Sequence, residues 1–237
     1  MDGFLNRGKG FQTSYVYNEI KRRIITLELK PGEIIEEKRL MAELEVGRTP
    51  IREALLMLKN EDLIVSLPNK SSYVKELTLK DVKDLSESLM AIEKLVTALA
   101  AQRMTPEIIG EIKEAEGEVE KAVGKKKHWE IETENRRFHQ LIARACDNRY
   151  LYSIHENLRN QISRLSYLAF SKDMENSFSL DNHLKKIVGD HRHLIRYLEH
   201  KDAQKAGELS IEHIRLFQDR MAFYLSRYFN ESIMKDI

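Results

Sequence analysis

The sequence contains little of several features that would place it in other classes of protein. Cys146 is the only cysteine among 237 residues, which excludes an intrachain disulfide and suits a reducing compartment. No apolar run approaches the roughly 18 to 20 residues of a membrane span. The N-terminal residues also lack the apolar centre of a signal peptide. The sequence therefore predicts a cytoplasmic protein with no membrane partner.

An excess of charge of one sign is also missing. The chain has 39 basic and 38 acidic side chains and a net charge of +1. A protein with this balance binds nucleic acid through a local patch of charge, because the chain as a whole has no basic excess. Proline and glycine are scarce, with 4 and 10 residues, and almost absent beyond Gly124. Their absence there favours long, uninterrupted helices.

The pattern of apolar residues divides the chain near residue 78. Residues 1–11 show no periodicity and are predicted to form a flexible tail. Helical spacing then runs from Ser14 to about Leu29, where Val16, Ile20, Ile24 and Leu27 recur. A short helix is expected over 37–44, and a third begins with Thr49 as N-cap and ends near Asn60. Two β-prone runs, 63–67 and 73–77, enclose a turn-rich loop and predict a hairpin.

Everything after Thr78 is helical in pattern. The first stripe of apolar residues consists of Val82, Leu85, Leu89, Ile92, Leu95 and Leu99. Further helices are expected from about 106, 128, 149, 180 and 202. The predicted fold class is therefore mainly α: a small α+β unit of three helices and a hairpin, followed by an all-α antiparallel bundle of about six helices.

Two arginines, Arg48 and Arg52, stand at the start of the predicted third helix, where the helix dipole disfavours cations. They share a face opposite the apolar residues of this helix. One interpretation is that both are solvated surface residues with acidic neighbours. The other is that they face DNA, since a helix-turn-helix presents the start of its second helix to the major groove, where arginine pairs with guanine. The order of helix, turn, helix and hairpin favours the second interpretation.

The stretch V-G-R-T-P-I-R-E-A-L, preceded by P-G-E-I-I-E-E-K-R-L-M-A-E-L and followed by L-I-V-S-L-P-N-K-S-S-Y-V, resembles the winged helix-turn-helix of GntR-type bacterial transcription regulators. The resemblance covers about residues 12–77 and implies a DNA-binding domain over 12–78 that binds double-stranded operator DNA. Gly47 and Ser71 depart from the family pattern, which usually has a hydroxyl residue and a wing-tip glycine there. The implied DNA contacts are Lys38, Arg48, Thr49, Arg52 and, at the wing tip, Asn69 and Lys70.

Four residues of the helical half carry a possible metal site. Asn135 and His139 are four residues apart and share one helix face. His191 and His213 each lie on the apolar stripe of a later helix. If they converge, three imidazoles and an amide oxygen would bind a divalent metal. Spacing alone leaves open the alternative of three unrelated core histidines, each hydrogen-bonded separately.

The segments N-R-R-F-H-Q-L-I-A-R-A-C-D-N, D-H-R-H-L-I-R-Y-L-E-H-K-D-A and I-E-H-I resemble the FCD domain, the ligand-binding half of the FadR subgroup, expected here over 79–230. The resemblance implies that Asn135, His139, His191 and His213 bind a divalent metal such as Zn, Ni or Mn. Neutral Asn135, in place of the aspartate of many relatives, leaves the ligand set without formal charge. The other histidines match no ligand position.

The resemblance also implies a small carboxylate effector that binds near the metal and an arginine. Arg164 and Arg159, both on the helix that begins near residue 149, are the expected partners of this carboxylate. Many relatives have an arginine four residues before the glutamate that corresponds to Glu93. This chain has Leu89 there, so either the pocket is more apolar or the first helix of the bundle does not supply the charge.

The expected function is that of a homodimeric transcription regulator, a repressor whose operator affinity is controlled by a small organic acid bound near the metal. No enzymatic activity is expected. Two alternatives are kept: a metal-dependent hydrolase that uses the histidine cluster to activate water, and a DNA-binding protein whose helical half only dimerises. The hydrolase would need a general base beside the metal, and the spacing of acidic residues singles out none.

Overall fold

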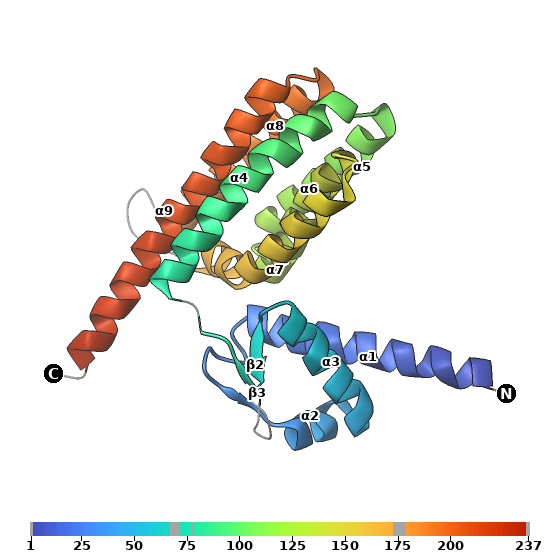
Figure 1. Cartoon of the computed structure of the whole chain (residues 1–237). Coiled ribbons are helices and arrows are strands. Elements are labelled where there is room, and N and C mark those ends of the chain that lie inside the picture. The colour runs from blue at the N-terminus through green and yellow to red at the C-terminus, as the bar shows by residue number, and fades with distance from the viewer. Residues whose placement is uncertain (1, 67–71, 77, 173–178, 236–237) are drawn as a thin grey trace. The chain divides into compact units, whose positions relative to one another are not determined.

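A computed structural model describes residues 2–66, 72–76, 78–172 and 179–235 (Figure 1). The chain divides into two compact units, Met1–Leu77 and Thr78–Ile237. Within the described residues, the first unit contains three helices and a small sheet, and the second contains six helices. The predicted fold class, a winged helix-turn-helix followed by a helical bundle, is confirmed.

The N-terminal unit contains helices α1 (Asp2–Ile25), α2 (Glu37–Leu44) and α3 (Arg48–Asn60). Helix α1 begins twelve residues before the expected Ser14, so residues 2–11 are helical where the sequence predicted a tail. It also ends earlier than expected, because Leu27 adopts a left-handed conformation with φ 63°. Leu29, beyond this turn, is buried in the core instead.

The core between α1 and α3 is aliphatic. Fully buried Val16, Ile20 and Ile24 of α1 belong to the same cluster as residues of α3. The predicted inward face of α3 is confirmed, since Ile51, Ala54, Leu55 and Leu58 are all buried. Each such side chain contributes roughly 1.5–3 kcal/mol when it leaves water, so this small unit is held together mainly by apolar burial.

The turn between α2 and α3 differs from the prediction in one detail. Gly47, not Thr49, is the N-cap of α3; its backbone is extended (φ −74°, ψ 172°) and no side chain caps the helix. Arg48 is therefore the first helical residue and Thr49 the second. Pro50 is still tolerated at the third position, because the first N–H groups of a helix have no partner inside the helix.

Three strands form the sheet: β1 (Ile34–Ile35), β2 (Ile64–Ser66) and β3 (Ser72–Val74), in the order β1-β3-β2. Both pairings are antiparallel. The β2–β3 hairpin matches the predicted wing. Strand β1 was not predicted, because two residues are too short to show an alternating pattern. The expected wing-tip contacts Asn69 and Lys70, and Ser71, lie outside the described residues.

The helical unit consists of α4 (Leu79–Arg103), α5 (Pro106–Gly124), α6 (His128–Ala145), α7 (Arg149–Ser171), α8 (Leu180–Glu199) and α9 (Ala203–Lys235). Side chains that start these helices explain their bounds. Thr78 and Asp81 form a capping box at α4, and Thr105 caps α5 ahead of Pro106. The Asn148 side chain accepts from two N–H groups of α7.

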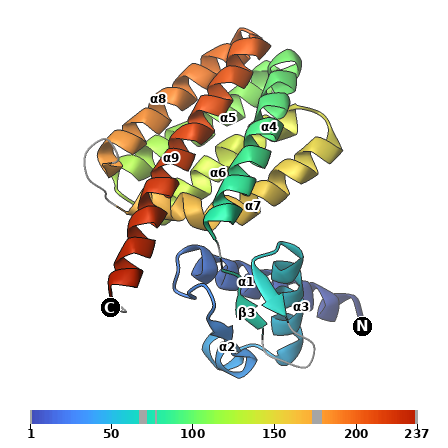
Figure 2. The ribbon, with the colours of Figure 1, turned by 60° about the vertical axis from the view of Figure 1, so that its left-hand side comes forward.

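Helix α4 is central to the packing of the bundle. It lies along α9 and also contacts α6 and α7, while α5 packs on α6 and α8 (Figure 2). Gly207 of α9 permits the close approach to α4, because an added Cβ there would lie 3.2 Å from the carbonyl oxygen of Lys94. Leu95, predicted on the inward stripe of α4, is 45% exposed, so that part of the prediction was wrong.

Candidate functional site

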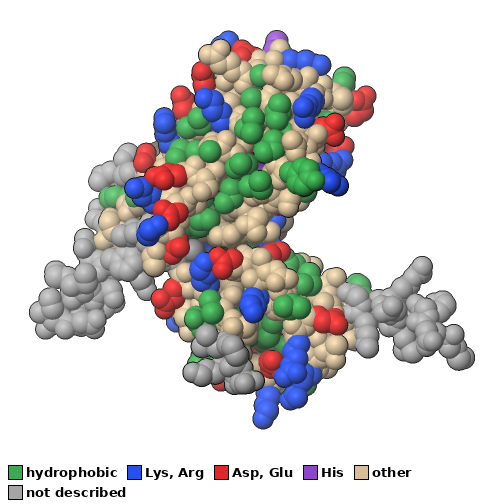
Figure 3. Space-filling view, viewed as in Figure 1, with side chains coloured by type: hydrophobic (Ala, Val, Ile, Leu, Met, Phe, Trp, Pro, Cys, Tyr) green, Lys and Arg blue, Asp and Glu red, His purple; other side chains and the backbone are tan. Residues whose placement is uncertain are grey.

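Three of the predicted DNA contacts lie together on the N-terminal unit. Lys38 at the start of α2 and Arg48 and Arg52 at the start of α3 line one open groove. Thr49 is exposed on α3 but does not line it. In Figure 3, Lys and Arg side chains gather at the lower end of this unit. Because the balance of charge over the chain is almost even, such a local patch is where a polyanion would bind.

An acidic side chain occupies this groove as well. Arg52 Nε lies 3.2 Å from Glu37 Oε2, and the Arg52 side chain is 62% exposed. An exposed pair of this kind contributes at most about 1 kcal/mol, so a phosphate or a guanine edge can replace Glu37 at little cost. Glu37 was not predicted as part of the site, although its place one residue before Lys38 puts it at the same helix start.

The three predicted histidines of the helical unit converge. One ligand atom from each of His139 on α6, His191 on α8 and His213 on α9 lies within 4.8 Å of the others. His139 and His191 are buried, and His213 is partly buried. The predicted fourth ligand, Asn135, is 5% exposed and lines the same cavity as His213.

The donor atoms at this cluster fit a metal ion. His139 Nε2, His191 Nε2 and Asn135 Oδ1 are buried and have no hydrogen-bond partner. A buried polar atom without a partner costs roughly 1–3 kcal/mol, and a bound metal would give these atoms a partner. Imidazole nitrogen and amide oxygen suit Zn, Ni and Mn alike.

Each histidine has a carboxylate behind its other ring nitrogen. His191 Nδ1 lies 2.5 Å from Glu116 Oε2, and His139 Nδ1 lies 3.6 Å from Glu93 Oε1. His213 Nδ1 lies 3.5 Å from Asp190 Oδ2. Contacts of this kind orient the rings and, where the carboxylate is ionised, make imidazole a more basic ligand. Two of these carboxylates, Glu93 and Asp190, supply negative charge that the Asn-His-His-His set itself lacks.

The protonation states suit cation binding. Burial, and next the charge of Arg159, lower the pKa of His191 to about 3 and hold the pKa of His139 well below its ordinary range. Burial also lowers the pKa of His213. The three rings are therefore neutral at neutral pH, the state in which imidazole binds a metal.

The three carboxylates differ in charge. Burial opposes ionisation of Glu93, but Arg159 and His155 outweigh it and hold its pKa well below the ordinary value. Asp190 is likewise buried, and its contacts with His213 and Lys186 lower its pKa. Burial raises the pKa of Glu116 to about 8. Glu93 and Asp190 are thus the ionised carboxylates around the cluster at neutral pH.

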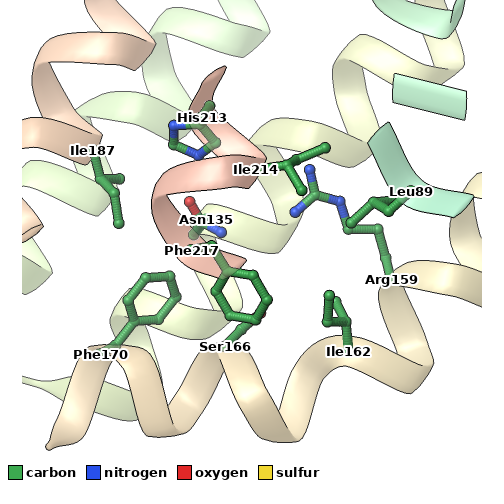
Figure 4. A pocket seen from close by; sticks show the side chains of 10 residues that line it. All are labelled: Leu89, Asn135, Arg159, Ile162, Ser166, Phe170, Ile187, His213, Ile214 and Phe217. Atoms are coloured by element: carbon green, nitrogen blue, oxygen red, sulfur yellow. The ribbon is translucent and has the colours of Figure 1, made fainter. Parts of the chain in front are cut away.

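A small cavity adjoins the cluster (Figure 4). Its volume is about 20 Å³, room for an ion or about one water molecule. Polar groups reach it from Asn135, His213 and Arg159, whose side chain extends into it from α7 (Figure 4). The remaining lining is largely apolar and includes Leu89, Ile162, Phe170, Ile187, Ile214 and Phe217.

The two predicted effector arginines are placed differently. Arg159 lines the cavity, and its Nε is buried without a hydrogen-bond partner. Arg164 is 2% exposed and so is also buried, but it is not among the described residues that line this cavity. Leu89 contributes an apolar wall. Among the described residues that line the cavity, Arg159 of α7 carries the positive charge.

The carboxylates behind the three histidines were not predicted as site residues, although two of them carry a signal in the sequence. Asp190 adjoins His191 in the sequence. Glu93 lies four residues after Leu89 and therefore on the inward face of α4, where an ionisable residue is unusual. His155, which matched no ligand position, is fully buried and lies 3.0 Å from Glu93. Within the described residues, no helix is both long and apolar enough to cross a membrane.

A winged helix-turn-helix with a basic groove, followed by a helical bundle with a buried histidine cluster, is the architecture of a DNA-binding regulator. Residues 12–74 match the family described as "Bacterial regulatory proteins, gntR family". Residues 84–216 match the family described as "FCD domain". The second match alone spans more than half of the chain. The chain therefore belongs to the GntR family of bacterial transcription regulators and carries an FCD domain.

Individual relatives agree with this family. The transcriptional repressor RspR of Escherichia coli is 27% identical over 169 residues, which are 71% of this chain and 74% of RspR. The gluconate operon transcriptional repressor of Bacillus licheniformis is 24% identical over 184 residues, 78% of this chain and 74% of that protein. The solved structure of E. coli McbR/YncC has the same fold, with a TM-score of 0.76 at 22% identity over 92% of this chain and 98% of that one.

These findings decide between the classes of function left open by the sequence. The family and the named relatives are transcriptional regulators, so this protein is a transcriptional regulator and the hydrolase alternative is set aside. GntR regulators bind operator DNA.

Proposed function

We propose that this protein is a homodimeric repressor of the bacterial cytoplasm, where its DNA lies, and that a small organic acid bound near a metal in the helical unit controls its operator affinity. The observations that carry the proposal are the convergence of three neutral histidines and the adjoining cavity, which Asn135, His213 and Arg159 line. A divalent metal held by Asn135, His139, His191 and His213 would offer open coordination positions to a carboxylate.

The DNA-binding half of the proposal rests on the groove of the N-terminal unit. Lys38, Arg48 and Arg52 line it, and Thr49 adds a hydroxyl at the start of α3. The wing-tip residues Asn69 and Lys70 are proposed as further contacts. One chain carries one reading helix, so a dimer on a palindromic operator doubles the contact and sets the spacing of the half-sites.

The cavity supports an organic acid as the effector. Arg159 presents a guanidinium group, which pairs well with a carboxylate, and its Nε has no acceptor. A volume of about 20 Å³ is too small for any organic acid, so binding must displace lining side chains. An effector that requires such a rearrangement favours one state of the bundle over another, as control of DNA binding demands. One relative is named as a gluconate operon repressor, and gluconate is a small carboxylate.

The proposal is tested by metal analysis and by DNA binding. The purified protein is expected to contain close to one divalent metal per chain and to bind DNA flanking its own gene. Gluconate and other small acids are then titrated, and at least one is expected to weaken DNA binding about tenfold or more. Arg159→Gln should abolish this response, whereas the exposed Arg144→Gln should keep it. Operator affinity that stays constant while an acid saturates the helical unit would contradict the proposed control.

A bundle that serves dimerisation alone is the second candidate. It predicts a dimer that contains no metal and keeps its stability when a chelator is added. That result would leave the DNA-binding half of the proposal intact and overturn the effector half.

A further inference from the structure

One buried carboxylate oxygen connects the histidine cluster with the arginine of the cavity. Glu93 Oε1 lies 3.0 Å from His155 Nε2 and 3.6 Å from His139 Nδ1, and it accepts a hydrogen bond from Arg159 Nη2. All four residues are buried. One oxygen atom is therefore shared among a metal-ligand histidine, a second histidine and the arginine that faces the ligand.

The other two carboxylates behind the histidines make no such connection within the described residues. Glu116 contacts His191, and its second oxygen has no hydrogen-bond partner. Asp190 contacts His213 and Lys186, whose side chain is 59% exposed. Glu93 is thus distinguished from Glu116 and Asp190 by its contact with Arg159.

We propose that Glu93 is a positioning residue that couples occupancy of the metal site to the position of Arg159. The proposal rests on the proposed metal function. Ligation of His139 through Nε2 fixes its proton on Nδ1 and makes that N–H a stronger donor. The 3.6 Å separation from Glu93 then shortens to a hydrogen bond. Glu93 Oε1 is drawn toward His139, and Arg159 loses part of its hold on that oxygen.

Arg159 is the group released by this shift. Its guanidinium is balanced by Glu93 in the absence of a ligand, so a carboxylate in the cavity must compete with Glu93 for it. Any change that draws Glu93 toward His139 makes Arg159 more available to that carboxylate. Because coupling is reciprocal, a carboxylate that takes Arg159 also frees Glu93 for His139 and strengthens metal binding.

Zn²⁺ alone is the probe that tests the coupling, since an added acid could also bind the metal directly. The full-length protein is labelled with ¹⁵N, and the Nε–H signal of Arg159 is assigned from its loss in Arg159→Lys. Addition of Zn²⁺ is expected to shift this signal in the wild type. In Glu93→Gln the shift is expected to disappear, and Zn²⁺ affinity should fall by roughly ten- to hundredfold, the usual effect of removing a group that orients a metal ligand.

Glu116→Gln is the matched control, because Glu116 is also a buried glutamate that contacts Nδ1 of a cluster histidine. It should weaken Zn²⁺ binding as well, yet keep the Zn²⁺-dependent shift of the Arg159 signal at saturation. Thermal unfolding confirms that each variant folds. If Glu93→Gln does not fold, the shorter carboxylate of Glu93→Asp serves instead, and it should reduce both the affinity and the shift.

Each outcome decides the matter. Zn²⁺ binding to the wild type without any shift of the Arg159 signal overturns the coupling, as does a shift that persists at full size in Glu93→Gln. Both results leave the proposed metal site in place. Failure of the wild type to bind Zn²⁺ overturns the metal function, and the coupling that rests on it falls too.

Discussion

The two units of the chain differ in where their charged side chains lie. Among the described residues, every buried polar or charged side chain belongs to the helical unit, and the N-terminal unit has an aliphatic core. Arg48 and Arg52 lie exposed on the proposed DNA-binding surface, whereas Arg159 is buried against Glu93. A unit that reads a large polyanion can keep its charges in water, but a unit that encloses a small ligand must bury them.

The difference has an energetic consequence. Removing an exposed charge hardly changes the stability of the fold. In the N-terminal unit, a substitution can therefore abolish DNA binding and leave stability unchanged. Removing one partner of a buried pair leaves the other charge uncompensated, which is strongly destabilising. In the helical unit, ligand binding and stability should therefore change together.

The largest effect expected from this comparison is on DNA binding. Arg48→Ala combined with Arg52→Ala should weaken operator binding by about a hundredfold or more, since each bidentate arginine–guanine pair contributes roughly 1–3 kcal/mol. The free energy of unfolding should change by no more than about 1 kcal/mol, because both side chains are exposed. Fluorescence anisotropy at fixed salt measures the first, and urea unfolding measures the second.

Arg144→Ala, which removes an exposed arginine of the helical unit, is the control for loss of charge alone. It should bind the operator as the wild type does. Operator binding that survives the double substitution in a folded protein would show that α3 is not the reading helix.

The next largest effect is the stabilisation of the protein by a bound metal, which should depend only on residues of the helical unit. Saturating Zn²⁺ at about a hundred times its Kd should stabilise the wild type by roughly 2.7 kcal/mol. His139→Gln should abolish this gain, and the exposed His193→Gln on α8 should retain it. Thermal unfolding with Zn²⁺ and with a chelator measures both. A gain of equal size in His139→Gln would place the metal elsewhere.

A third effect follows from His183, which is 3% exposed and has no hydrogen-bond partner at either ring nitrogen. Burial, and next the charge of Arg220, lower the pKa of His183 from 6.5 to about 3. Because the folded value lies below the unfolded one, the unfolded chain takes up the proton first as the pH falls. Stability is therefore complete above about pH 6.5 and is lost progressively between about pH 6.5 and 3.

At about pH 5 this linkage should cost the wild type on the order of 2 kcal/mol. His183→Leu removes the titrating group, so its stability should fall less steeply between pH 7 and 5 than that of the wild type. His193→Leu, on the exposed side of the same helix, should leave the slope unchanged. Urea unfolding at several pH values gives the slopes, and equal slopes for wild type and His183→Leu would contradict the assignment.

The same comparison explains how far the sequence could predict the structure. Apolar periodicity located the helices, because each must bury one face, and Ile51, Leu55 and Leu58 were assigned correctly for that reason. Arg48 and Arg52 were predicted as site residues because their unfavourable position at the positive end of the helix dipole can be recognised from the sequence alone. The start of α1 and the short strand β1 were missed, since neither carries a periodic signal.

The histidine cluster was predictable in part. Helical spacing placed His139, His191 and His213 on inward faces, but only the packing of α6, α8 and α9 brings their ring atoms within 4.8 Å. The contact of Glu93 with Arg159 joins residues 66 positions apart, and no local pattern encodes it. Pairs of buried charges that are distant in the sequence are therefore hard to predict from it. Here they lie in the helical unit.

The smallest effect concerns the start of α3, the proposed reading helix. Gly47 is the N-cap of α3 and offers no side-chain cap. An added Cβ there meets nothing within 4 Å, so Gly47→Ser should be accommodated without strain. The introduced hydroxyl can accept only from the N–H of Thr49, because the following Pro50 has none. The free energy of unfolding should rise by only a few tenths of a kcal/mol.

Gly47→Ala separates this cap from the general effect of replacing glycine. Alanine supplies the same Cβ without the hydroxyl and is a poor N-cap, so the serine variant should be more stable than the alanine variant by about 1 kcal/mol. Operator affinity should change by less than about threefold in either variant, because Arg48 and Arg52 keep their places. Equal stability of the two variants would mean that no cap forms. A large loss of operator affinity in both would mean instead that the bare N–H groups at the start of α3 themselves bind phosphate.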